Sequence, residues 1–281
     1  MNDSVLVTGA TGTLGKAIVE AAVNAGISVR QGVRSQAKAN PRADAAHLDY
    51  ADPATVPPAL AGASAVVLMA PPLDPNAPAQ LRPVISAAKA ANVRHLILIS
   101  AFGVNHNEQA PLRVVEHLVM DSGVPFTILR PNFFMENFSE GAQVHGIRQG
   151  NAIHLAAGDG KTSFISVRDV ASAVVAALQQ SPSGREFDLT GPAALDHADV
   201  ARIIGEASGR SVVYQPLTDE QMLEGARAHG MPEPSVAYLG ILYSVVRAGF
   251  AASVAGDYEA LTGRKPTTFE AFAKSSAAAW S

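Results

Sequence analysis

The sequence contains no cysteine and few charged or aromatic residues. Its 281 residues include no Cys, 16% charged residues and 6% aromatic residues, with a net charge of −4. Without cysteine the chain can form no disulfide, no thiolate metal site and no thiol nucleophile, which fits a reducing cytoplasm. The small negative charge gives no indication that nucleic acid or an anionic membrane is a partner.

Long apolar runs are also missing. No apolar segment is long enough to cross a bilayer, and the start Met1-Asn2-Asp3 lacks the basic region of a signal peptide. Hydrophobic residues nevertheless make up 48% of a chain long enough for one large α/β domain, or for a domain with a small appendage. We therefore expect a folded, soluble, cytoplasmic protein that spans no membrane.

Signatures of several other chemistries are missing as well. The histidines show no H-E-x-x-H or other ligand spacing, so we expect no metal site. The chain has no G-x-S-x-G of a serine hydrolase, and Lys16 follows Gly15 without the spacing of a P-loop lysine.

The strongest functional signal lies at the start of the chain. A short apolar run from Ser4 is followed by glycines at 9, 12 and 15 and then by apolar residues at helical spacing. Such a turn presents backbone N–H groups and the positive end of a helix dipole, which suit a pyrophosphate. Gly9 would permit the turn, Gly12 would let phosphate approach, and Gly15 would let the helix pack closely. A tight turn that binds nothing is the alternative. The loop residues that we expect to contact the cofactor are Gly9, Thr11, Gly12, Thr13, Leu14 and Gly15.

Arg34 follows the second predicted strand, residues 27–34. In a dinucleotide-binding fold this position faces the adenosine ribose, where an acidic residue would hold the 2′-hydroxyl of NAD and an arginine would pair with the 2′-phosphate of NADP. The segment supplies the arginine and no acid, which favours NADP(H) over NAD(H); a solvated surface arginine is the alternative.

Strand-like and helix-like segments alternate along the chain. Strands are predicted at 4–7, 27–34, 43–48, 63–69, 93–99 and 124–130, with helices at 14–22, 78–92 and 110–122 between them. This alternation predicts an α/β fold, with a Rossmann-like, doubly wound parallel sheet and helices on both faces, over residues 1–138. Residues 139–281 are predicted to form a small mixed α/β substrate-binding cap, from which some elements return to the main sheet. Its predicted strands are 152–155, 163–165, 186–189 and 212–215, and its predicted helices are 167–179, 197–207, 218–228, 237–250 and 268–274.

The loops that follow the strands are where an open α/β sheet binds ligands. Asp49 could reach an adenine amino group; the alternative is that its side chain only takes part in a turn. Ser100 could hydrogen-bond the nicotinamide ribose or the substrate, or cap its own loop. The further cofactor contacts that we expect are Ala70 and Pro71 in the loop 70–75, Ser100, Ala101, Phe102 and Pro131.

Three residues near this edge could take part in catalysis: Ser100, His106 and Asn132. Asn132 could touch the nicotinamide amide or form an Asx turn, and His106 is a candidate proton donor or a surface-loop histidine. Apolar side chains could wall a substrate pocket or simply form core; Phe133 and Phe134 are adjacent, so both cannot face one core. The proposed pocket residues are Phe133, Phe134, Met135, Phe138, Phe164, Tyr238 and Tyr243.

Several separated motifs resemble one family. They are Gly9–Gly15, Arg34, Ile99–Gly103, Leu129–Asn137, Phe164–Val170 and Leu261–Glu270. Together they are similar to the NmrA-like, atypical short-chain dehydrogenase/reductase family over nearly the whole chain. The resemblance implies an NAD(P)H-binding Rossmann protein. Members include quinone, azo-dye and triphenylmethane-dye reductases, enzymes of natural-product pathways, and redox-sensing regulators without catalysis.

The chain departs from the short-chain dehydrogenase pattern at the acid–base pair. These enzymes usually carry Tyr-x-x-x-Lys on the helix after the fifth strand, where lysine lowers the tyrosine pKa. In the register of similar sequences, Leu112 stands at the tyrosine position and Glu116 at the lysine position. Carbonyl–alcohol chemistry by that mechanism is therefore not expected.

Three functions remain after this departure. The leading hypothesis is an NADPH-dependent reductase that transfers hydride to a small apolar or aromatic substrate such as a quinone, an enone or a dye-like polycycle, without the Tyr–Lys pair. The alternatives are an NADP(H)-sensing regulatory protein without turnover, and an isomerase or cyclase on the same fold. The sequence leaves the oligomeric state open, with a homodimer as one option.

Overall fold

The computed structural model describes residues 4–35, 38–71, 74–141, 143–182 and 184–281. Residues 72 and 73 of the predicted loop 70–75, and the start Met1-Asn2-Asp3, lie outside these ranges. The chain divides into two units. Unit 1 comprises Met1–Pro131, Val167–Asp188 and Ala260–Gly263, and unit 2 comprises Asn132–Ser166, Leu189–Glu259 and Arg264–Ser281. The first unit thus ends at Pro131 and takes back two later segments, whereas the sequence suggested a division after residue 138.

Unit 1 is built on a seven-stranded sheet in the order β3-β2-β1-β4-β5-β6-β8. Parallel pairing joins β1 to β2 and β4, β2 to β3, β4 to β5, and β5 to β6. The late strand β8 completes the sheet beside β6. The strands are β1 (Ser4–Val7), β2 (Val29–Val33), β3 (Asp44–His47), β4 (Ala63–Met69), β5 (His95–Ile99), β6 (Phe126–Pro131) and β8 (Arg185–Leu189).

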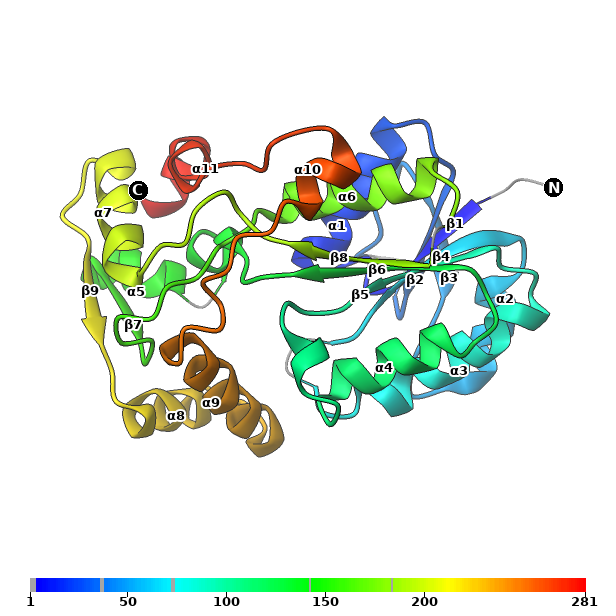
Figure 1. The fold of residues 1–281 in the computed structure, drawn as a ribbon, viewed down its shortest axis with the longest axis horizontal. Coiled ribbons are helices and arrows are strands. Elements are labelled where there is room, and N and C mark those ends of the chain that lie inside the picture. The colour runs from blue at the N-terminus through cyan, green and yellow to red at the C-terminus, as the bar shows by residue number, and fades with distance from the viewer. Residues whose placement is uncertain (1–3, 36–37, 72–73, 142, 183) are drawn as a thin grey trace. The chain divides into compact units, whose positions relative to one another are not determined.

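Helices cover both faces of this sheet, with α1 and α6 on one face and α2, α3 and α4 on the other (Figure 1). Because of this cover, β4 and β5 are almost entirely apolar and buried. Helix α1 buries Gly15, Ile18, Val19 and Ala22, which recur on one helical face. The predicted Rossmann-like, doubly wound sheet is therefore confirmed. The helices are α1 (Thr13–Asn24), α2 (Val56–Leu60), α3 (Ala77–Ala90), α4 (Pro111–Met120) and α6 (Val167–Gln179), with short 3-10 turns η2 (Pro53–Thr55) and η3 (Val104–His106).

Unit 2 packs its helices around an aromatic core and a two-stranded parallel sheet, β7 with β9. Trp280, at the end of the chain, is fully buried, and its indole N–H donates to the carbonyl oxygen of Phe138 at 2.6 Å. This bond ties the C-terminus into the core. The elements are η4 (Met135–Phe138), α5 (Gln143–Gly150), β7 (Ala152–Leu155), α7 (His197–Ser208), β9 (Val213–Pro216), α8 (Asp219–Ala228), α9 (Glu233–Arg247), α11 (Phe269–Ser276) and η5 (Ala277–Trp280), while α10 (Asp257–Thr262) runs across the division between the units.

Two predictions for unit 2 differ from the structure, one in the existence of a strand and one in the bounds of a helix. Residues 163–165 form no strand, because the segment pairs only as a single bridge between Ile165 and Phe134. The helix expected at 237–250 spans Glu233–Arg247 instead. It starts earlier because a proline is tolerated in the first turn of a helix, and it ends before Gly249, whose φ of +82° is left-handed. Helices α5 and α10 were not expected from the sequence.

Candidate active site

The glycine turn between β1 and α1 is shaped by two of its three glycines. Gly9 has a φ of +60°, the left-handed region that favours glycine. A Cβ on Gly15 would lie 2.2 Å from the backbone oxygen of Gly9, so only glycine permits this close approach. A Cβ on Gly12 would lie 3.5 Å from the same oxygen, which is ordinary contact. Gly12 is therefore dispensable for the turn itself, and its exposed position leaves the outer side of the loop open.

The first N–H groups of helix α1 have neither a capping side chain nor a nearby acidic residue among the described residues. Gly12 is the N-cap residue, and in the described chain no side chain caps the helix and no acidic residue stands in its first turn. The first N–H groups of a helix have no intrahelical partner, and they carry the positive end of the helix dipole. Thr11 is half-buried and Thr13 exposed, so the loop is accessible. These residues fit the pyrophosphate of a dinucleotide.

The parallel register brings the predicted cofactor residues to one edge of the sheet. Val7 pairs with Val67, Met69 with Ile99, and Ile99 with Leu129, so these strands end side by side. The residues just beyond those ends are the ones predicted from the sequence. They comprise Gly9 after β1, half-buried Ala70 and exposed Pro71 after β4, buried Ser100 and half-buried Ala101 and Phe102 after β5, and buried Pro131 at the end of β6.

Arg34 and Asp49 follow the two neighbouring strands β2 and β3. Arg34 is exposed, and it makes no hydrogen bond or ion pair with any residue that the structure describes. Its guanidinium is thus available to a phosphate. One Asp49 carboxylate oxygen accepts the N–H of Ala51 at 3.0 Å, which is an Asx turn. The turn role that the sequence left open for Asp49 is therefore present, and any contact with adenine remains a prediction.

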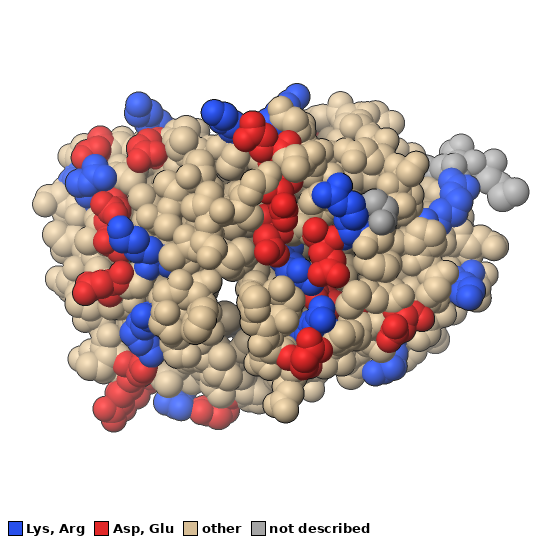
Figure 2. Space-filling view, viewed as in Figure 1, with Lys and Arg blue, Asp and Glu red and all other residues tan. Residues whose placement is uncertain are grey.

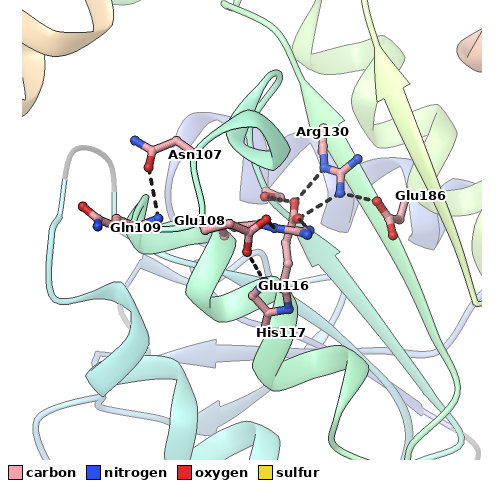
Figure 3. Close-up of polar contacts among 9 residues, drawn as sticks. Asn107, Glu108, Gln109, Glu116, His117, Arg130 and Glu186 are labelled. Atoms are coloured by element: carbon pink, nitrogen blue, oxygen red, sulfur yellow. Dashed lines mark hydrogen bonds and ion pairs between the residues drawn. The ribbon is translucent and has the colours of Figure 1, made fainter.

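A buried network of charged side chains lies beneath the end of β5. Glu116 on α4 has no exposed surface, and its carboxylate accepts hydrogen bonds from Arg130 Nε at 2.7 Å and Arg130 Nη2 at 2.8 Å. Arg113 Nη1 at 2.9 Å and the Ser100 hydroxyl at 2.6 Å complete the set of donors. Arg130 also pairs with Glu186 of β8 and lies between the two glutamates (Figure 3).

The network fixes Glu116 as a carboxylate anion. Burial alone would raise the pKa of the Glu116 carboxyl, but the hydrogen bonds from Arg130, Ser100 and Arg113 outweigh it and hold the pKa below its usual value. Burial opposes the charge of Arg130 in the same way, and the hydrogen bonds to Glu116 and Glu186 raise its pKa. Glu116 therefore carries no proton to donate at neutral pH.

This network was not predicted from the sequence. Glu116 was expected only as the residue at the lysine position, without a link to Arg130. Both residues nevertheless carry a signal in the sequence. Arg130 is the one charged residue of β6, and Glu116 lies next to Val115 and Val119 on the buried side of α4. Buried charges are nearly always paired, so two such residues on neighbouring elements are candidates for each other.

The two other predicted catalytic residues differ in their surroundings. His106 is exposed at the end of η3 in unit 1. Asn132, in unit 2, is buried, and its side-chain NH₂ donates to Ser163 Oγ at 2.8 Å and to the carbonyl oxygen of Ala251 at 2.9 Å. Its side-chain oxygen accepts the N–H of Phe133. Asn132 thus holds three segments of unit 2 together, and a direct role for it in catalysis remains a prediction.

The predicted substrate residues all lie in unit 2 and form two groups. Met135, Phe138 and Phe164 are buried, with the Phe138 and Phe164 rings 5.4 Å apart. Met135 and Phe164 also line a cavity of about 190 Å³. The remaining residues are half-buried, namely Phe133, Phe134, Tyr238 and Tyr243, and the Phe133 and Tyr243 rings lie 6.0 Å apart. Burial raises the pKa of both tyrosines.

The charges on one face and the lengths of the described helices can be compared with the expectations about partners. On the face shown in Figure 2, acidic and basic side chains are interspersed and most of the surface is uncharged. Within the described ranges, every helix is too short or too polar to span a bilayer. No group of three or more His, Asp or Glu side chains among the same residues could hold a metal ion.

Comparisons with known proteins agree with the geometry of this edge. A family profile described as NAD(P)H-binding matches residues 9–181. The NAD(P)H azoreductase of Xenophilus azovorans is 34% identical over 98% of this chain and 99% of its own, and the agroclavine dehydrogenase of Claviceps fusiformis is 32% identical over 99% and 98%. The structure of the Escherichia coli NADPH-dependent quinone oxidoreductase with NADPH has a TM-score of 0.84 at 25% identity, covering 96% of this chain and 99% of that one. The chain belongs to the NAD(P)H-binding, NmrA-like family of atypical short-chain oxidoreductases.

Proposed function

We propose that the protein is an NADPH-dependent reductase that transfers hydride to a flat, apolar, conjugated acceptor such as a quinone, an enone or a dye-like polycycle. The class of acceptor is inferred from two residues of helix α4. In the register of similar sequences, Leu112 of this helix stands at the position of the proton-donating tyrosine. Glu116 is an anion whose carboxylate accepts hydrogen bonds from protein side chains. An acceptor that needs only a hydride, with its proton taken from water, suits this site.

The cofactor preference is supported by the amino-terminal half of unit 1. The uncapped N-terminus of α1 would hold the pyrophosphate, and exposed Arg34 would pair with the 2′-phosphate. Bound NADPH would supply the hydride, so that a quinone, one NADPH and one proton give a hydroquinone and NADP+. The chain's own residues bind and orient the cofactor at the carboxyl edge of the sheet.

The direct test is NADPH oxidation with a panel of acceptors. Quinones, enones, azo dyes and triphenylmethane dyes should be reduced, whereas simple ketones should not react. Binding of NADPH without turnover of any acceptor would contradict the reductase and support the cofactor sensor. Activity with simple ketones would contradict the argument from Leu112.

Two variants test the cofactor site itself. Gly12→Val should prevent dinucleotide binding while the protein stays folded, because a Cβ there meets only ordinary contacts inside the turn. Arg34→Ala should lose about 1.5–3 kcal/mol of NADPH affinity, the contribution of one charge-assisted contact, with NADH affinity unchanged. Calorimetry with both cofactors measures each effect. An unchanged preference in Arg34→Ala would remove this residue from the site.

A further inference from the structure

The Ser100–Glu116 contact fixes the direction of one hydrogen bond at the candidate active site. The two side-chain oxygens lie 2.6 Å apart, a distance that requires a hydrogen between them. Glu116 is ionised and accepts from Arg130 and Arg113 as well, so it has no hydrogen to give. The hydrogen must therefore come from Ser100. A serine hydroxyl has one hydrogen, and this one is committed to Glu116.

The Ser100 hydroxyl can therefore accept a further hydrogen bond but cannot donate one. Its oxygen keeps lone pairs for an additional partner that can donate. Its backbone is fixed, because its N–H donates to the carbonyl oxygen of Leu129 at 2.8 Å. It stands directly after β5, beside the ends of β4 and β6. The partner of Ser100 at this edge must therefore bring an N–H or O–H group.

The proposed substrates do not supply such a group. Quinones, enones and azo compounds present carbonyl or azo groups to their surroundings, and these groups accept hydrogen bonds. A nicotinamide dinucleotide does supply donors, in its carboxamide NH₂ and its ribose hydroxyls. The polarity of Ser100 thus matches the cofactor and opposes a role as proton donor to the substrate.

We propose that Ser100 binds the nicotinamide end of the cofactor as a hydrogen-bond acceptor, and that Glu116 is the positioning residue that fixes this polarity. The inference rests on the proposed function, because it needs a nicotinamide cofactor at this edge. In this proposal Glu116, at the position of the lysine, orients the hydroxyl group of Ser100. Arg130, only 3% exposed, and Arg113 keep Glu116 ionised and immobile.

The first test separates cofactor binding from turnover with Ser100→Ala. We expect the Kd for NADPH, followed by nicotinamide fluorescence, to rise about tenfold, the effect of one hydrogen bond. At saturating NADPH, kcat should fall by a smaller factor than the NADPH affinity, because no proton is lost with the hydroxyl. A fall in kcat at unchanged Kd would overturn the proposal, since it would make Ser100 a donor to the substrate. Unchanged values of both would overturn it as well.

A matched control removes another buried hydroxyl from unit 1. Thr127 on β6 is buried, and its Oγ1 hydrogen-bonds His95 Nε2 at 2.9 Å, away from the carboxyl edge of the sheet. Thr127→Val should leave the Kd for NADPH unchanged although it also loses a buried hydrogen bond. If it weakened NADPH binding as much as Ser100→Ala, the effect of Ser100 would be one of general stability, and the proposal would fail.

The second test asks whether Glu116 acts through Ser100. In Glu116→Gln the amide can donate to Ser100, which frees the serine hydrogen and reverses its polarity. NADPH affinity should fall as it does in Ser100→Ala, and the double variant should show no further loss. Additive losses in the double variant would overturn the positioning role.

Folding of the variants and the proposed function are checked in the same experiment. If Glu116→Gln does not fold, Glu116→Asp, which keeps the charge on a shorter side chain, replaces it and should lose less NADPH affinity than Ser100→Ala; an equal or greater loss would contradict the inference. Failure of the wild type to bind NADPH would overturn the proposed function and this inference together. Wild-type binding and turnover with unchanged affinity in Ser100→Ala would overturn the inference alone.

Discussion

The two units bury different kinds of side chain. In unit 1 the buried cluster is aliphatic, with members such as Leu6, Leu68 and Leu98, and the buried side chains of Glu116 and Arg130 pair with each other. In unit 2 the core is rich in aromatic rings, and it encloses the imidazole of His197 within 6.0 Å of the Phe138 ring and 5.7 Å of the Phe164 ring. Unit 1 thus combines an aliphatic core with a buried ion pair, whereas the core of unit 2 is built largely from packed rings.

This difference has a consequence for how each unit responds to mutation. Removal of one partner from a buried ion pair leaves an uncompensated charge, while removal of a ring leaves a void. Both changes are costly, but only the first can be reversed by removing the second partner as well. The predictions below test this distinction, in order of decreasing effect.

Arg130→Met should destabilise the protein most, by about 3–5 kcal/mol, because it leaves the Glu116 carboxylate buried without its main cation. The free energy of unfolding from urea titration measures the loss. The double variant Arg130→Met/Glu116→Leu removes both charges and should recover much of it. A double variant no more stable than Arg130→Met would contradict charge compensation as the organising feature of unit 1.

Phe138→Ala should cost a similar or slightly smaller amount, about 3–5 kcal/mol, because it opens a cavity among three rings. Phe138 is 1% exposed, and its ring lies within 6.0 Å of the rings of Phe164, His197 and Phe269. Phe138→Leu, which fills most of the space, is the control and should cost clearly less. A loss below about 1 kcal/mol in Phe138→Ala would instead suggest a side chain that lines an accessible pocket.

Acidification should destabilise both units through one buried histidine each. Burial lowers the pKa of His95 in unit 1 and of His197 in unit 2 to about 4, from 6.5 in the unfolded chain. Because the unfolded chain binds the proton more tightly, stability is complete above pH 6.5 and falls as the pH drops towards 4, by up to about 3 kcal/mol for each histidine.

The variant His197→Phe separates the contribution of unit 2. It keeps an aromatic ring beside Phe138 and removes the titrating group, whose Nδ1 has no hydrogen-bond partner among the described residues. Between pH 6.5 and 4 its free energy of unfolding should fall less than that of the wild type. If the free energy of unfolding fell equally in both proteins, titration of His197 would not contribute to the acid destabilisation.

Glu108→Gln should have the smallest effect. Glu108 joins His117 at 2.7 Å and Arg113 at 3.1 Å at the surface of α4, close to Glu116 in Figure 3. Solvent screens such exposed pairs, so we expect an unchanged free energy of unfolding within experimental error. A loss comparable to that of Arg130→Met would mean that the surface pair supports the buried network.

The sequence predicted local structure in unit 1 better than in unit 2. The glycine turn and the apolar strands depend on short-range patterns, and Gly9 and Ser100 lie just beyond β1 and β5 because those strands end where the apolar runs end. The strand predicted at 163–165 was wrong because three residues are too few to show a period, and Phe134, their only bridge partner among the described residues, is remote in the sequence. The Glu116–Arg130–Glu186 network could not be assembled for the same reason, since its members are 14 and 56 positions apart.

The route of the chain between the units limits how the protein can be divided. Because β8 and α6 lie after Asn132–Ser166 in the sequence, a fragment that stops at Pro131 would expose β6 as an unpaired edge and would deprive Arg130 of Glu186. Exchange of unit 2 with that of a relative would need five junctions, after residues 131, 166, 188, 259 and 263. A truncated cofactor-binding fragment should therefore aggregate, as exposed strand edges tend to do, so hybrid reductases are better built by grafting internal segments than by joining halves.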